Sequence, residues 1–324
     1  MGRLQQEAAR SDADAYEAAA VILNWNNAPA TCACLDALLR QDKPALLIVC
    51  DNGSEDESVP EILSWAAKRS VSASLNPAEK TARLLVQRNS ANLGYAAGNN
   101  PGIRIALSRD CRFVWLLNND ARPAPGALAA LLACAEERPE DGIFGATVTS
   151  SAQPGRIEAA GGCGYSPLTS ISRARHKGRL LAELDALPEP DLDYIYGAAM
   201  LVRAEVFRHV GLLNEEFFLF YEELDLCARA RQKGYGLHWR RDAWVEHAAG
   251  LSMSKHPPAF IQYHENRSTL LFTRRHYSRL LPLVALIRFL AKVTLLPLRG
   301  EFRVLPAVLR AYYDVLLRKN ASSA

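Results

Sequence analysis

A short polar cluster, Asn118-Asn119-Asp120, directly follows the apolar run at 113–117. The apolar residues favour β-structure and predict a buried strand that ends at the cluster. In open α/β folds, ligands bind at the carboxyl ends of the strands. Amide and carboxylate oxygens are hard ligands, so the cluster predicts a Mg²⁺ or Mn²⁺ site that holds a diphosphate. The alternative is a plain turn, because Asn and Asp favour turns.

Two further polar loops follow predicted strands, at 24–27 and 51–54. In a doubly wound sheet these loops and the 118–120 cluster emerge at one edge. Asp51 is a candidate acceptor for a base N–H, although an Asx-turn with Gly53 explains that tetrapeptide equally well. The segment 92–100 is rich in Gly and Asn and is expected to be a loop that enters a helix near phosphate or ribose. It lacks the Gly-Lys-Ser/Thr ending of a P-loop.

Three carboxylates, Glu222, Glu223 and Asp225, follow an aromatic run at 217–221. On a helix, Asp225 and Arg229 are spaced for an i,i+4 ion pair, which is a structural role. Glu222 and Glu223 lie about 100° apart on a helix, so they cannot both point the same way. One of them in an apolar cleft would have a raised pKa, which suits a general base.

The dipeptide Glu246-His247 ends a predicted strand at 235–247. A lone histidine is more often a structural residue than a metal ligand. Beside a metal site at Asp120, however, His247 becomes a candidate ligand, since neutral imidazole binds ions such as Mn²⁺.

The order of the elements predicts an α/β fold with a Rossmann-like, doubly wound parallel or mixed sheet, because strands alternate with helices up to residue 147. From 150 to 190 this pattern stops and Gly, Ser, Pro and Arg dominate, so we expect long loops near the site. Strand and helix patterns then resume from 194 to 247. The predicted strands are 19–25, 45–50, 83–86, 113–117, 142–147, 194–202 and 235–247, and the predicted helices are 31–40, 60–68, 102–107, 126–137, 205–209 and part of 214–233.

The C-terminal region at 256–324 is predicted to be helical, basic and apolar. Its segment 280–298 is strongly apolar but carries Arg288 and Lys292 on one helix face, which a transmembrane span seldom tolerates near its centre. Ten Lys or Arg lie between 274 and 319, against Glu301 and Asp314. This composition predicts peripheral contact of 274–319 with an anionic membrane. The alternatives are helices packed on the core, or the interface of a homo-oligomer.

The overall composition indicates a globular chain, with 49% hydrophobic and 23% charged residues among 324. A net charge of +3 is too small to imply nucleic acid as a partner. The seven cysteines show no zinc-binding spacing, which predicts reduced thiols in a cytoplasmic protein. Residues 1–18 are polar, so they predict a flexible tail and not a signal peptide.

Taken together, these segments resemble family 2 glycosyltransferases of the GT-A fold, in particular the bacterial rhamnosyltransferase-like branch. The resemblance covers about residues 19–250, and its motifs occur in the family order. It implies a catalytic domain at 19–255, with a nucleotide-binding half at about 19–150 and an acceptor half at about 151–255. The matching segments are 21–27, 51–54, 92–100, 116–120, 196–200, 218–229 and 244–247.

The resemblance also implies roles for single residues. Asp120 and His247 would bind the divalent cation, and Glu223, or its neighbour Glu222, would be the catalytic base. The sequence departs from the family's Asp-x-Asp motif at Asn118, and its Glu-Glu pair replaces the usual Glu-Asp. The residues expected to bind the nucleotide sugar are Asn24, Asp51 (the base), Asn52, Asn92 and Gly94 (ribose and diphosphate), Asn118, Asn119 and Gly197 (sugar pocket).

The implied reaction is an inverting displacement, in which a sugar moves from a nucleotide diphosphate to a hydroxyl of a glycan or polyprenyl-linked acceptor. The implied location is the inner face of the cell membrane. Two other hypotheses are a sugar nucleotidyltransferase and a non-catalytic protein that binds nucleotide sugars. The first lacks a Gly-rich basic phosphate loop after the first strand. The second does not explain the presence of Asp120, Glu223 and His247 together.

Overall fold

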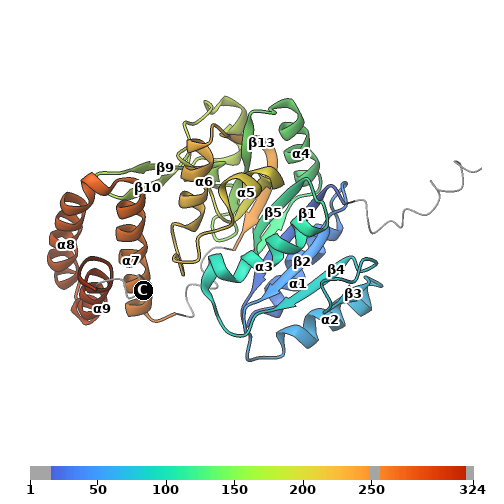
Figure 1. The fold of residues 1–324 in the computed structure, drawn as a ribbon. Coiled ribbons are helices and arrows are strands. Elements are labelled where there is room, and N and C mark those ends of the chain that lie inside the picture. Colours follow the sequence, from blue (N-terminus) through green and yellow to red (C-terminus); the bar gives the residue numbers. More distant parts are fainter. Residues whose placement is uncertain (1–15, 249–255, 319–324) are drawn as a thin grey trace, which may run out of the picture.

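The structure is a computed structural model that describes residues 16–248 and 256–318, so most of the predicted tail at 1–18 lies outside the described residues. A large mixed sheet forms its centre, with the strand order β3-β4-β2-β1-β5-β12-β7-β13-β6 and with β8 paired to β7 (Figure 1). The strands of this sheet are β1 (Ala18–Asn24), β2 (Leu46–Asp51), β3 (Ala73–Ser74), β4 (Leu84–Arg88), β5 (Phe113–Asn118), β6 (Ala121–Pro123), β7 (Asp141–Ser150), β8 (Ile157–Ala160), β12 (Ala199–Arg203) and β13 (Gly236–His247).

The central strands β1, β2 and β5 run parallel, as their uninterrupted apolar sequences predict for strands covered on both faces. Their register pairs Leu23 with Asn118 and Asn24 with Asp51. The polar residues that follow the three strands therefore meet at one edge of the sheet. β12 lies antiparallel between β5 and β7, which makes the sheet mixed.

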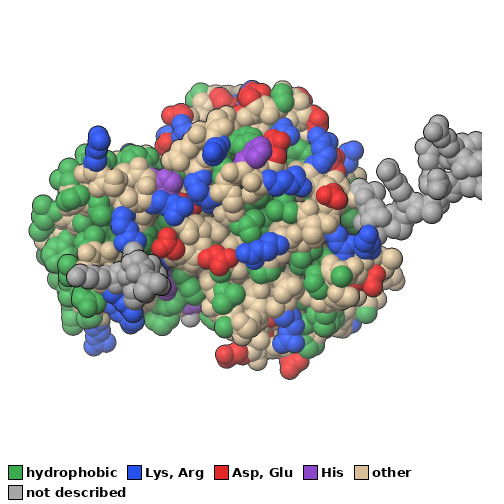
Figure 2. All heavy atoms as spheres, in the orientation of Figure 1, with side chains coloured by type: hydrophobic (Ala, Val, Ile, Leu, Met, Phe, Trp, Pro, Cys, Tyr) green, Lys and Arg blue, Asp and Glu red, His purple; other side chains and the backbone are tan. Residues whose placement is uncertain are grey.

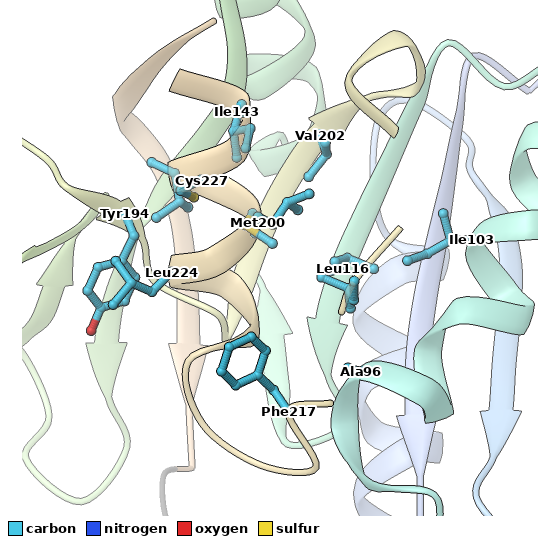
Figure 3. Close-up of a cluster of buried hydrophobic side chains, with 14 of the residues drawn as sticks. Ala96, Ile103, Leu116, Ile143, Tyr194, Met200, Val202, Phe217, Leu224 and Cys227 are labelled. Atoms are coloured by element: carbon cyan, nitrogen blue, oxygen red, sulfur yellow. The ribbon is translucent and has the colours of Figure 1, made fainter. Parts of the chain in front are cut away.

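Helices cover both faces of the sheet. One face packs on α1 (Ala28–Leu39), α2 (Ser58–Lys68) and α4 (Ala127–Glu137). The other packs on α3 (Gly94–Ser108), α5 (Ala204–Val210) and α6 (Glu222–Gln232). Figure 3 shows this second layer, where Leu224 and Cys227 of α6 meet Met200 of β12 while Ile103 of α3 faces Leu116 of β5. The core thus fixes the positions of α3 and α6 relative to the polar sheet edge.

Two local expectations are wrong. The segment 150–190 is not only loop, because it forms β8, the strands β9 (Gly162–Ser166) and β10 (Ile171–Ala174), and a 3-10 helix at Leu181–Ala186; β11 (Tyr194–Ile195) completes a small antiparallel sheet with β9 and β10. Two glycines conceal β9, yet Gly162 is needed there, since a side chain would overlap the Tyr194 carbonyl. The glycine-rich segment is also not a loop throughout, because α3 begins at Gly94.

The C-terminal region is helical, as predicted, and consists of α7 (Pro258–His276), α8 (Leu281–Leu298) and α9 (Leu305–Tyr312), with short turns of helix between and after them. In Figure 1, α7 stands beside the part of the fold built on the main sheet, and α8 and α9 lie on its outer side. The segment Ser278–Leu298 is long and apolar enough to cross a membrane by length and composition, and 17% of it is buried.

Candidate active site

A buried hydrogen-bond network links the ends of β1, β2 and β5. Asn24 donates to Asp51 Oδ1 (2.9 Å) and accepts from the Thr31 hydroxyl (2.6 Å). Asn119 donates to the same hydroxyl (3.3 Å), and Ser54 donates to Asp51 through its hydroxyl (2.6 Å) and its backbone N–H (3.1 Å). Asp51 therefore accepts hydrogen bonds within its own turn, from Ser54, while its role toward a nucleotide base stays a prediction. With exposures of 0% and 1%, Asn24 and Asp51 support the site from behind.

The glycine-rich turn is fixed by two asparagines. Asn52 donates to Asn92 Oδ1 (2.9 Å) and to the Gly94 carbonyl (3.2 Å), and Asn92 Oδ1 also accepts from the Gly94 N–H (3.0 Å). Gly94 has a φ of +81°, and a Cβ at this position would overlap the Phe218 carbonyl. Only glycine lets the turn approach so closely. The turn is thus held on one side by the end of β2 and on the other by the segment before α6.

Asp120 and His247 meet, as the sequence predicted. Asp120 lies between β5 and β6, and β6 pairs antiparallel with β13 so that Ala121 stands opposite His247. His247 Nε2 is 3.2 Å from Asp120 Oδ1, and its Nδ1 is 3.2 Å from Glu158 Oε1. Burial alone would lower the pKa of His247, but hydrogen bonds to both carboxylates raise it to about 9. Glu158, on β8, therefore fixes the ring orientation.

A cavity of about 200 Å³ opens at this edge of the sheet. Its polar wall consists of predicted site residues and His256, and its apolar wall comes from the aromatic residues Trp25, Tyr95 and Phe218 together with two leucines. Such a mixture of flat apolar surfaces and a few convergent polar groups is typical of a small-molecule site. The predicted residues that line it are Asn52, Asn92, Gly94, Asn118, Asn119, Asp120 and His247.

A divalent cation fits this donor set. The Asp120 carboxylate and the Nε2 nitrogen of His247 lie 3.2 Å apart, and the side-chain nitrogen of Asn118 is 3.2 Å from the same ring nitrogen. Within residues 16–248 and 256–318, no group of three or more His, Cys, Asp or Glu side chains is arranged to hold a metal. Mg²⁺ is usually held by one or two protein carboxylates together with substrate phosphates and water. The site suits a cation that arrives with a diphosphate.

Of the two glutamates at the start of α6, Glu223 lies at a second cavity. Glu223 lines this cavity of about 250 Å³ together with Tyr194, Tyr221 and Glu265. Its carboxylate lies against Gly197, whose carbonyl accepts a hydrogen bond from Tyr95 Oη (3.3 Å) on the wall of the first cavity. Gly197 and Glu223 therefore lie where the two cavities adjoin.

Burial raises the pKa of both glutamates, and for Glu222 the neighbouring Glu223 raises it further. One carboxylate oxygen of each, Oε2, has no hydrogen-bond partner in the described part of the chain. A carboxylate of this kind accepts a proton readily near neutral pH, which is the requirement for a general base.

The remaining carboxylate, Asp225, has the structural role that its spacing predicted. It bonds to Arg229 Nε at 2.7 Å, and in addition to His276 Nε2 of α7 at 2.7 Å. Burial acts to raise its pKa, but these cationic partners hold the pKa below its ordinary value. Asp225 thus joins α6 to α7.

Sequence reasoning missed two polar residues of the site. Glu158 lies in the segment expected to be loop, where no periodic pattern singles out one carboxylate. It accepts a hydrogen bond from Tyr196 Oη (2.5 Å) as well as contacting His247. Tyr95 stands inside the glycine-rich motif, and burial, followed by the charges of Glu222, Glu223 and Asp120, raises its pKa. An aromatic residue directly after Gly94 is the feature of the sequence from which Tyr95 could have been predicted as a site residue.

The fold and this arrangement agree with the comparisons. Residues 19–211 match Glycosyl transferase family 2, and the chain belongs to this family. It is therefore a glycosyltransferase that uses a nucleotide-sugar donor. The chain is 25% identical over 258 residues to the N-acetylglucosaminyl-diphospho-decaprenol L-rhamnosyltransferase of Mycobacterium tuberculosis, covering 74% of this chain and 78% of that one.

A second relative is the low-salt glycan biosynthesis hexosyltransferase Agl10 of Haloferax volcanii. It is 27% identical over 195 residues, which cover 58% of this chain. The match spans 59% of the length of the Haloferax protein.

Solved structures confirm the GT-A fold. The structure of S. aureus TarS 1-349 in complex with UDP-GlcNAc has a TM-score of 0.58 at 14% identity, covering 92% of this chain and 80% of that one. The mannosyltransferase PcManGT of Pyrobaculum calidifontis, in complex with GDP-Man and Mn²⁺, has a TM-score of 0.55 at 16% identity, covering 95% and 89%. The predicted mixed sheet with helical C-terminal extension is thereby confirmed.

Proposed function

We propose that the chain is an inverting glycosyltransferase that moves a sugar, with rhamnose as the first candidate, from a nucleotide diphosphate to a hydroxyl of a glycan or polyprenyl-linked acceptor. Such a reaction belongs to the synthesis of cell-surface polysaccharide. The observation that carries the proposal is that Asp120 and His247 line the cavity at the sheet edge while Glu223 lines the cavity beside it. The name of the mycobacterial relative supports the sugar and the lipid-linked acceptor.

In this mechanism the donor occupies the cavity at the sheet edge. Asn52 and Asn92 hold the glycine-rich turn at the phosphate-binding wall. Asp120 and His247 would hold Mg²⁺ or Mn²⁺, which supplies positive charge to the departing diphosphate. Glu158 keeps the His247 ring in place through Nδ1.

The acceptor hydroxyl approaches from the cavity beside Glu223. Glu223 takes its proton as the oxygen attacks the anomeric carbon on the face opposite the diphosphate. This geometry inverts the configuration of the anomeric carbon. A cytoplasmic location at the inner membrane face stays a prediction, and the seven free cysteines are compatible with it.

The first test is a thermal-shift screen of the whole chain against UDP, GDP and dTDP, each with and without Mn²⁺. A ligand that binds the native state at 100 times its Kd stabilises it by about 2.7 kcal/mol. We expect one nucleotide to raise the melting temperature further in the presence of Mn²⁺, and Asp120→Ala to lose that increment. The exposed Asp185 in the 3-10 helix at Leu181–Ala186 provides the matched control, Asp185→Ala.

An unchanged Mn²⁺ increment in Asp120→Ala would contradict the metal role. Radiolabelled sugar nucleotides then separate the remaining hypotheses. A transferase yields glycosylated acceptor or slowly hydrolysed sugar, whereas a non-catalytic binding protein yields neither. Release of pyrophosphate from a sugar phosphate and a nucleoside triphosphate would indicate a nucleotidyltransferase.

A further inference from the structure

The outer face of α8 and α9 is an exposed apolar surface. On α8, the side chains at 283, 286, 287 and 290 recur at helical spacing, and Leu286 and Leu290 are 55% and 51% exposed. Figure 2 shows hydrophobic side chains gathered over these helices at the left end of the molecule. A contiguous apolar area of this kind marks an interaction site. The surface consists of Leu283, Leu286, Ile287, Leu290, Leu295, Leu298, Phe302, Leu309, Tyr313, Leu316 and Leu317.

The charged residues of α8 face the opposite way. Arg288 and Lys292 both bind Glu265 of α7, each at 3.0 Å, and Lys292 also donates to Gln262 Oε1 at 2.8 Å. Burial alone would raise the pKa of Glu265, but the two cations hold it below its ordinary value. The charges that argued against a membrane segment in the sequence are thus neutralised on the protein side, and the outer face stays apolar.

This arrangement favours a helix that lies on the membrane surface over a helix that spans the bilayer. A helix that crossed the bilayer alone would have to leave α7, which would expose Arg288 and Lys292 to lipid without their carboxylate. If α7 accompanied it, then Arg267, Arg274 and Arg275 would enter the hydrocarbon as well. Both of these arrangements would cost far more free energy than contact of the outer face with the membrane surface. α8 therefore lies along the interface, with one side in the lipid and the other on α7.

The charges around the apolar surface indicate which partner it takes. Arg279 precedes α8, and Arg299 and Arg303 follow it. All three are exposed and, among the described residues, none pairs with a carboxylate. Glu301 is the exposed acid between them. A second copy of the chain on the same face would bring like charges together. Anionic lipid headgroups match both the apolar centre and the basic ends.

We propose that the outer face of α8 and α9 docks on the surface of a membrane that contains anionic lipid, with α8 lying in the plane of the interface. This inference goes beyond glycosyl transfer. It rests on the exposed leucines and the position of the arginines, and it needs no donor or acceptor.

The test is flotation of the full chain with vesicles of phosphatidylcholine alone and of phosphatidylcholine mixed with phosphatidylglycerol. We expect binding to the mixed vesicles and its loss in Leu286→Glu/Leu290→Glu. The matched control is Leu75→Glu/Leu180→Glu, since these leucines are 50% and 45% exposed on the catalytic domain. Replacing Arg279, Arg299 and Arg303 by Gln should weaken binding roughly 100-fold, at about fivefold for each cation near the surface.

Three results would overturn the proposal. The first is that the parent chain does not float with the mixed vesicles. The second is that the control variant loses as much binding as Leu286→Glu/Leu290→Glu. The third is that the parent chain binds no vesicles but forms a dimer in sedimentation velocity, and that Leu286→Glu/Leu290→Glu dissociates this dimer, because the surface would then be an interface between two copies. Circular dichroism melts of each variant verify folding. Because no sugar nucleotide is used, failure here leaves the transferase proposal intact.

Discussion

The first turn of α6 carries carboxylates with opposite surroundings. Asp225 is 0% exposed and bonds to Arg229 and His276, so its pKa lies below the ordinary value. Glu222 is buried and Glu223 half-buried, neither pairs with a cation within the described residues, and the pKa values of both are raised. The same helix thus carries one acid that stabilises the fold and two that retain affinity for a proton.

The difference shows why residue type alone does not identify a catalytic acid. Asp225 has the right chemistry and lies next to the site, but its charge is used to tie α6 to α7. Glu222 and Glu223 lower the stability of the folded state at neutral pH, because each buried charge lacks compensation. We interpret that cost as the functional signature, since perturbed carboxylates collect at active sites.

The largest expected effect comes from Glu223→Gln. Loss of a general base costs about 10²- to 10⁴-fold in rate, while the amide keeps the size of the side chain. We therefore expect kcat for sugar transfer to fall by this factor, with donor affinity unchanged in calorimetry. Parental transfer rates in this variant would exclude Glu223, and an equal or larger loss in Glu222→Gln would assign the base to its neighbour.

The second effect is on stability and comes from Asp225→Asn. Removing one partner of a buried ion pair destabilises by about 3–5 kcal/mol. Because the pKa of Asp225 is lowered in the folded state, its contribution is present above the ordinary Asp value of about 3.9 and is lost as pH falls through the lowered value. Urea unfolding should show that the free energy of unfolding of the variant is far below that of the parent at pH 7, and that the two values become equal in acid. A constant difference would mean that packing, and not charge, explains the loss.

The smallest effect is a gain in stability from Glu222→Gln. The pKa of Glu222 is raised in the folded state. The contribution of this group to the free energy of unfolding is therefore fully present below its unfolded pKa of about 4.3, and it is lost as pH rises through the raised pKa. The Gln variant should be more stable than the parent by about 1 kcal/mol at pH 7 to 8, and equal to it near pH 4. Thermal melts across this range measure it. A destabilised variant at pH 8 would show that the carboxylate has a compensating partner.

Much of the fold was predictable because its signals are local. Apolar runs marked β1, β2 and β5, and their shared direction placed the polar ends at one edge. The meeting of Asp120 with His247, 127 positions apart, was inferred from resemblance, because no local pattern encodes the β6–β13 pairing that causes it. Glu158 was missed for the same reason. The strand β9 was missed because its glycines, of which Gly162 is required for a close backbone contact, weaken the strand pattern.

The contact at Gly94 has a mechanical consequence. With no side chain in between, the backbone N–H of Tyr95 reaches the Phe218 carbonyl at 2.8 Å. The glycine-rich turn and the segment that leads to Glu222 are therefore joined by this hydrogen bond. If a donor fills the cavity beside the turn, we expect any shift of the turn to move the start of α6 as well. Nucleotide binding and the position of the proposed base would then be coupled.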